Sequence, residues 1–338
     1  MARWKTSKLY IILQSEVADL KYTVGLQNKN DDFLEKIVEN REHIYEVYFS
    51  WGDIPNGRNL QTQSEDYTAW EMHSWQVNAL QKLSQNNIPL NILFNANCYG
   101  KDSQSRAFFN KLGNVVDYVQ NNFGLNSVTT TSPLIAKFIK NNFEDIEVRA
   151  SVNMEIGTIA AMEYISDYFD SYYMKREYNR DFDRIKMLKD WCDANSKKLF
   201  ILANSGCLNF CSAHNFHDNL VSHESEIAGM DNAYNFSGVC HEFLKKEENL
   251  SKLIEYTNFI RPEDIDKYHG LVDAIKLATR VHKTPGEVLE SYTGKKYSGD
   301  ILRILEPSHS IYPYVLENGN PIKLKKINTD IYLGEEIK

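Results

Sequence analysis

The sequence lacks the features that mark several classes of protein. No stretch approaches the roughly 18 consecutive apolar residues that a membrane-spanning helix needs. The short apolar run Leu9–Leu13 near the N-terminus does not have the length or the small-residue cleavage site of a signal peptide. The chain also has no internal repeat and no low-complexity linker. We therefore expect a soluble, cytoplasmic globular protein with no membrane partner.

Basic residues and cysteines are also scarce. The 338 residues include 38 Lys and Arg against 46 Asp and Glu, which gives a net charge of −8. This balance argues against a general polyanion-binding surface, so bulk nucleic-acid binding is not expected, although a local basic groove is still compatible with it. Five Cys, an odd number, indicate free thiols or metal ligands and not a disulfide framework.

Strand-like apolar runs alternate with segments of helical period along nearly the whole chain. The expected strands are Leu9–Leu13, Glu46–Trp51, Leu90–Asn95, Ser127–Thr131, Val148–Val152, Ser171–Met174, Leu199–Ala203 and Phe259–Ile260. Helices are expected after each of them except Leu199–Ala203, which is followed by an irregular stretch, and the last helix is expected over Leu271–Arg280. Strands separated by helices pair in parallel through right-handed crossovers.

Eight such units favour a (β/α)8 TIM-type barrel with a long loop after strand 7 and a C-terminal extension. The alternative is an open doubly wound sheet, but the Gly-rich loop that usually follows its first strand is not visible. The expected domains are a barrel over 1–282, with a cysteine-rich insertion at 205–258, and a helical extension and tail over 283–338. In a barrel this insertion covers the carboxyl-terminal face, where active sites are built.

The densest group of potential ligands lies in this insertion. Cys207 and Cys211 have a C-x3-C spacing, and Cys240 follows within a stretch that also holds four of the nine histidines. Thiolates are soft ligands for Zn²⁺ and for iron–sulfur clusters. Free cysteines are also common buried residues, so the spacing alone leaves both interpretations open. Cys98, just past the third expected strand, would lie on the same face of a barrel.

Polar side chains follow several of the expected strands, at positions where barrel enzymes bind substrate and place catalytic groups. Arg176 could bind a carboxylate or a phosphate, and Glu177 could act as an acid or a base. Structural ion pairs at the barrel rim are the alternative role for this pair. The further candidates for substrate binding are Arg58, Asn97, Asn153, Asn204 and Arg261.

Three short blocks carry a resemblance to a known family. They are SYYMKREYNRD (171–181), LFILANSGCLNFCS (199–212) and GLVDAIKLATRVHKTPGEVLESY (270–292). With the order of segments, they make the chain similar over residues 8–295 to peptidase family U-thirty-two (U32), the collagenase-like proteases. The relatives of that family include the oxygen-independent hydroxylases of ubiquinone synthesis and RNA modification.

The resemblance implies an iron–sulfur-dependent, oxygen-independent oxidoreductase of the hydroxylase type. In this group a set of cysteines holds an iron–sulfur cluster, and the hydroxylases use prephenate as an oxygen source. By this likeness Cys207, Cys211 and Cys240 would hold a [4Fe–4S] cluster, with Cys98 as a fourth ligand. Relatives place their later cysteines at other spacings. The alternative to a four-cysteine site is therefore a cluster held by three cysteines, with one iron position open.

Two further hypotheses stay open. One is a peptidase or hydrolase with a zinc ion on the Cys/His loop, in line with the family name. The other is a non-catalytic, metal-stabilised barrel that acts as a subunit of a complex with a homologous or accessory protein. The sequence does not identify a substrate.

Overall fold

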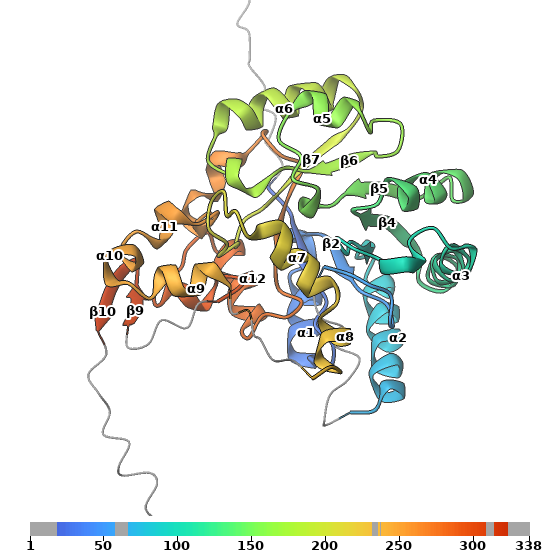
Figure 1. Ribbon diagram of the computed structural model, residues 1–338, viewed down its shortest axis with the longest axis horizontal. Coiled ribbons are helices and arrows are strands. Elements are labelled where there is room, and N and C mark those ends of the chain that lie inside the picture. The colour runs from blue at the N-terminus through green and yellow to red at the C-terminus, as the bar shows by residue number, and fades with distance from the viewer. Residues whose placement is uncertain (1–18, 58–66, 232–235, 237, 309–313, 324–338) are drawn as a thin grey trace, which may run out of the picture.

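A computed structural model describes residues 19–57, 67–231, 236, 238–308 and 314–323 of the chain. Its centre is a closed barrel of eight parallel strands, with helices around it (Figure 1). The strands are β1 (Tyr22–Gly25), β2 (Ile44–Phe49), β3 (Leu90–Phe94), β4 (Leu125–Thr130), β5 (Glu147–Ala150), β6 (Ser171–Tyr173), β7 (Lys198–Leu202) and β8 (Ala274–Leu277). Pairing of Tyr22 with Ile275 joins β1 to β8 and closes the barrel. The expected (β/α)8 barrel is confirmed.

Each strand is followed by at least one helix. After β1 to β6 come α1 (Asp31–Glu39), α2 (Ala69–Gln85), α3 (Arg106–Phe123), α4 (Pro133–Asn142), α5 (Ile159–Glu163) and α6 (Phe182–Ala194), and α12 (Pro285–Thr293) follows β8. Helices α1 to α6 each begin after a residue whose side chain caps them. Thr68 and Glu71 form a capping box at α2, and the Ser132 side chain accepts from the main chain at the start of α4, where Pro133 takes the first position.

The last expected strand is wrong, and the first strand of the barrel comes later in the chain than expected. Leu9–Leu13 lies outside the described residues, and the structure places β1 at Tyr22–Gly25. Phe259–Ile260 forms no strand, and β8 occupies Ala274–Leu277, inside the segment expected to be a helix. Barrel strands are buried on both faces, so a short strand such as β8 shows no period that separates it from a buried helical segment.

The segment between β7 and β8 is longer than the other connections and carries short helices. These are α7 (His214–Ser222), α8 (Glu224–Ala228), α9 (Val239–Leu244), α10 (Glu247–Leu250) and α11 (Leu253–Tyr256). Figure 1 shows α7 in yellow across the centre of the barrel, and its residue Asp218 lines a pocket together with the carboxyl ends of the strands. This insertion therefore covers the barrel mouth. No helix among the described residues has the length and apolarity to cross a membrane.

The amino-terminal half of the barrel is filled by a buried ionic cluster. Arg149 in β5 is fully buried, and its guanidinium contacts Glu46 of β2 and Glu147. The guanidinium also lies 4.0 Å from the centroid of the Phe200 ring, so the cation rests on an aromatic face. Buried, paired charges therefore occupy the amino-terminal end of the barrel. The pocket described below lies at the opposite end, at the carboxyl ends of the strands.

Candidate active site at the barrel mouth

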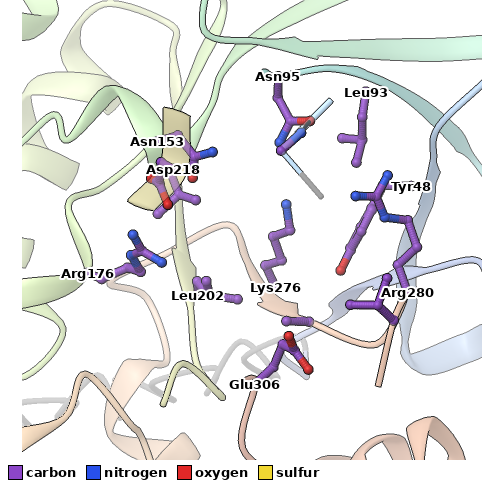
Figure 2. Close-up of a pocket in the computed structure, with 14 residues that line it drawn as sticks. Tyr48, Leu93, Asn95, Asn153, Arg176, Leu202, Asp218, Lys276, Arg280 and Glu306 are labelled. Atoms are coloured by element: carbon purple, nitrogen blue, oxygen red, sulfur yellow. Dashed lines mark hydrogen bonds between the residues drawn. The ribbon is translucent and has the colours of Figure 1, made fainter. Parts of the chain in front are cut away.

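A pocket opens among the carboxyl ends of the strands, where barrel enzymes place their active sites. The polar and charged residues that line it include Tyr48, Asn95, Asn153, Arg176, Asp218, Lys276, Arg280 and Glu306. Figure 2 shows Lys276 rising from β8 into the middle of this ring, with Arg176 on one side and Arg280 on the other. Six of the eight barrel strands, all except β1 and β4, contribute or end near residues that line this pocket.

The pocket is lined by more basic than acidic groups. Arg176, Lys276 and Arg280 line it, and each is 6–7% exposed. The Lys276 ammonium lies 4.3 Å from the centroid of the Tyr48 ring, which helps to hold a cation there. Buried guanidinium and ammonium groups at the end of a barrel form a binding site for a carboxylate or a phosphate.

The Arg-Glu pair predicted from the sequence lies at this mouth. Both residues belong to η4 (Arg176–Tyr178), directly after β6. Arg176 Nη1 lies 3.6 Å from the Cys207 sulfur, and its Nη2 contacts the His214 ring. The Glu177 side chain is 2% exposed, and its Oε2 has no hydrogen-bond partner among the described residues. A buried carboxylate oxygen without a partner points to a ligand or a proton that it would hold.

Three carboxylates surround His214 at the start of α7. Its Nδ1 lies 2.8 Å from Glu155 Oε1 and 4.0 Å from Glu177 Oε1, and its Nε2 lies 3.2 Å from Asp218 Oδ2. Neither Glu155 nor Asp218 was predicted as a site residue from the sequence. The i, i+4 spacing of His214 and Asp218 was a usable signal, whereas nothing local marks Glu155.

The predicted cysteine ligands Cys207, Cys211 and Cys240 lie close to one another, and none is in a disulfide. Burial raises the pKa of Cys240, and the neighbouring thiols Cys207 and Cys211 raise it further, because thiolates repel one another. Yet among the described residues only Glu155, Glu177 and His214 bring three ligand atoms within 4.8 Å of each other. The three sulfurs are therefore more widely spaced than in a zinc tetrahedron, whose bonds of about 2.3 Å put sulfurs about 3.8 Å apart.

Cys98, the expected fourth ligand, lies elsewhere. Its sulfur accepts from Gly100 N at 3.4 Å, and a hydrogen bond with His223 lowers its pKa. His223 follows α7, nine residues after His214, which corresponds to about 13 Å along the helix. His214, at the other end of α7, contacts Arg176, which in turn contacts Cys207. The structure therefore places Cys98 toward the opposite end of α7 from Cys207, and Cys98 as the fourth ligand stays a prediction.

The remaining predicted residues have mixed outcomes. Asn153 lines the mouth, and Asn97 lies beside Cys98 with its Oδ1 buried and without a partner in the described part of the chain. Asn204 is fully buried, and its amide bonds to the main chain of Ala278 and Ile304, so it joins strand ends and does not face substrate. Arg261 pairs with Asp264 on the surface, away from the pocket lining. Arg58 lies outside the described residues.

The sequence and the fold were compared with those of known proteins to test the resemblance to peptidase family U32. No family model matches the sequence. A curated protein of Methanocaldococcus jannaschii, named Uncharacterized protease MJ1657, is 28% identical over 305 residues, which are 88% of this chain and 86% of that protein. The solved structure of the U32 peptidase Mk0906 has the same fold, with a TM-score of 0.54 over 82% of this chain and 96% of its own, at 12% identity. The resemblance to peptidase family U32 that the three sequence blocks indicate is therefore confirmed.

Proposed function

We propose that this protein is an iron–sulfur-dependent, oxygen-independent oxidoreductase of the hydroxylase type that acts on a small anionic substrate. One observation carries the proposal: a group of three thiols adjoins a basic pocket at the barrel mouth. The contact of 3.6 Å between Arg176 Nη1 and Cys207 Sγ joins the two. The same guanidinium lines the pocket, so a substrate bound there would lie next to the thiols.

The donor set suits an iron–sulfur cluster better than a structural zinc. Cys207, Cys211 and Cys240 supply soft sulfur ligands, and their spacing exceeds that of a zinc tetrahedron. These three residues would hold the cluster, which supplies electron-transfer chemistry when bound. With Cys98 at the far end of α7, three cysteines support the version with one open iron position.

The other residues of the mouth have roles that follow from their chemistry. Arg176, Lys276 and Arg280 would bind the anionic groups of the substrate, as two carboxylates of a molecule such as prephenate require. Glu177, buried and with one oxygen unpartnered, would move a proton. Helix α7 covers the pocket and would limit the access of water.

The cysteine assignment can be tested with single serine variants purified without oxygen. Cys207→Ser, Cys211→Ser and Cys240→Ser should each lose most of the iron and acid-labile sulfide of the wild type. Cys98→Ser is the matched control and should keep both, because its thiol pairs with His223. Full iron and sulfide in the Cys207→Ser variant would refute the proposed ligand set.

A thiol peptidase is a second candidate, favoured by a specific observation and by the name of the Methanocaldococcus relative. Cys98 pairs with His223, and Glu226 Oε2 lies 3.2 Å from His223 Nδ1. Nucleophile, base and orienting carboxylate are the parts of a cysteine hydrolase. The thiolate would attack an acyl carbon, the imidazolium would protonate the leaving amine, and water would then cleave the thioester.

An aryl ester distinguishes this second activity from the first. A thiol hydrolase should release a burst of one nitrophenolate per chain from 4-nitrophenyl acetate and carry the acetyl group on Cys98, detected by mass spectrometry. His223→Ala should abolish the burst, whereas Cys207→Ser should leave it unchanged. Acetylation distributed over lysines, with no burst, would exclude the peptidase interpretation.

A further inference from the structure

We infer that Glu155, Glu177 and His214 form a binding site for a single divalent transition-metal ion, separate from the thiol ligands. One nitrogen and two carboxylate oxygens lie within 4.8 Å of one another, from three different segments of the chain. Glu155 follows η3 (Val152–Met154), Glu177 lies in η4, and His214 begins α7. The inference rests on this geometry and does not depend on the cluster proposed above.

The distances suit a metal on Nδ1 of His214. Ligands about 2.1 Å from an ion lie about 3.0 to 3.4 Å from each other in octahedral or tetrahedral arrangements. Glu155 Oε1 is 2.8 Å from Nδ1 and Glu177 Oε1 is 4.0 Å from it, values on either side of that range. Small movements of the two carboxylates would therefore complete the site.

Burial and an unpartnered oxygen support a ligand at this point. His214 and Glu177 have side chains 9% and 2% exposed, and Glu177 Oε2 has no partner in the described part of the chain. A buried carboxylate in this state costs free energy unless a cation or a proton compensates it. Two carboxylates balance the charge of a divalent ion, whereas Lys175, 3.3 Å from Glu155, balances only one of them.

On the opposite side of the imidazole lies a carboxylate, Asp218, which is a usual partner of metal-binding histidines. With a metal on Nδ1, Nε2 carries the proton and can donate it to Asp218 Oδ2, 3.2 Å away. Such a carboxylate–histidine–metal arrangement fixes the tautomer and the ring orientation. Arg176 Nη2 contacts Nε2 and also lies 3.4 Å from Nδ1, so its guanidinium would have to turn toward Asp218 to leave Nδ1 to the metal.

The backbone holds Glu155 in an unusual conformation. Its φ is +53° and its ψ is +40°, in the left-handed region that residues with a side chain rarely adopt. Strained positions of this kind gather at binding and catalytic sites. Asn153, two residues before Glu155, lines the pocket, so the proposed metal site lies beside it.

The chemistry of the three ligands narrows the choice of metal ion. One imidazole and two carboxylates suit Mn²⁺, Fe²⁺ or Zn²⁺, whereas thiolates select softer ions. Bound at this place, the ion would act as a Lewis acid that polarises a substrate oxygen or lowers the pKa of a water molecule. Mn²⁺ is therefore the probe that distinguishes this site from the cysteines.

The inference can be tested by titrating chelator-treated, full-length protein with MnCl₂. The electron paramagnetic resonance signal of free Mn²⁺ measures how much of the ion stays unbound. We expect one Mn²⁺ per chain, with the same affinity in the Cys207→Ser variant. Glu177→Gln should abolish binding, and its near-identical volume should preserve the fold, checked by circular dichroism. Asp218→Asn should weaken binding 10- to 100-fold, as loss of an outer hydrogen-bond partner does.

The matched control is Glu163→Gln, which changes an exposed carboxylate on α5 and should leave binding unchanged. Wild-type protein that binds no Mn²⁺ at millimolar concentration would overturn the inference, and so would unchanged binding in Glu177→Gln. Loss of binding in Cys207→Ser alone, with Glu177→Gln unaffected, would assign the ion to the thiols and also overturn it. Iron and sulfide contents are independent of these results, so the cluster proposal succeeds or fails separately.

Discussion

The buried ionic cluster at the bottom of the barrel makes a quantitative prediction about Glu147. Its Oε1 accepts from Arg149 Nη2 at 2.6 Å and from Ser171 at 2.6 Å, and its Oε2 accepts from Lys198 at 2.6 Å. Burial opposes ionisation, but the charge of Arg149 and the hydrogen bonds of Lys198 and Ser171 outweigh it. They lower the pKa of Glu147 from 4.5 to about 2.

Because the pKa of Glu147 is lower in the folded than in the unfolded protein, its carboxylate stabilises the fold at every pH at which it is ionised. The stabilisation is fully present above the unfolded pKa of about 4.5, and it is lost as the pH falls toward the folded pKa of about 2. At about 1.4 kcal/mol for each tenfold change in proton affinity, it amounts to about 3 kcal/mol. The Glu147 side chain is 18% exposed, so solvent screens this interaction only in part.

Glu147→Gln removes the charge with little change in shape. We expect the free energy of unfolding, measured with urea at pH 7, to fall by about 3 kcal/mol, and the difference from wild type to shrink between pH 4.5 and pH 2. Glu163→Gln on the surface of α5 is the control and should change stability by less than about 0.5 kcal/mol. A loss below about 1 kcal/mol at pH 7, or a difference that stays constant down to pH 2.5, would refute this reasoning.

Three further predictions concern the thiols, the core and the pocket. Iodoacetamide at pH 7 should alkylate Cys98 much faster than the buried Cys192, whose pKa is raised to about 12, and His223→Ala should slow Cys98 alone, as peptide mapping would show. Leu80→Ala, at a fully buried position of α2, should lower the free energy of unfolding by about 2 to 5 kcal/mol in a urea titration. Lys276→Gln should weaken the binding of a dicarboxylate such as malonate about 10- to 100-fold in calorimetry, because a charge-assisted contact of about 1.5 to 3 kcal/mol is lost. Equal rates at Cys98 and Cys192, an unchanged core variant or unaltered malonate affinity would each contradict the corresponding argument.

The sequence predicted the barrel because its middle units carry strong local signals. The helices from α2 to α6 begin at or near recognisable caps such as Thr68 and Ser132, and the strands from β2 to β7 overlap the segments expected to be strands. β1 and β8 were missed because their identity depends on the pairing that closes the barrel. That pairing joins residues some 250 positions apart, beyond the reach of a local pattern.

The site was predictable to a lesser degree. Arg176 and Glu177 were identified because they follow a strand, where the barrel brings side chains together, and Cys207 was identified by its spacing from Cys211. Glu155 was missed because it lies in a turn after β5 whose left-handed backbone has no glycine to mark it. Asn204 was misassigned, since a polar residue at a strand end can equally bond the main chain of its neighbours.

The most direct test of the account is the metal content of the wild-type protein purified without oxygen. We predict about four iron and four acid-labile sulfide per chain, at most one equivalent of another divalent metal, and an iron absorption band that bleaches in air. Zinc without sulfide would contradict the proposed cluster and shift the function to hydrolysis or to a structural metal. Protein free of iron and sulfide would reduce Cys207, Cys211 and Cys240 to ordinary thiols of the insertion.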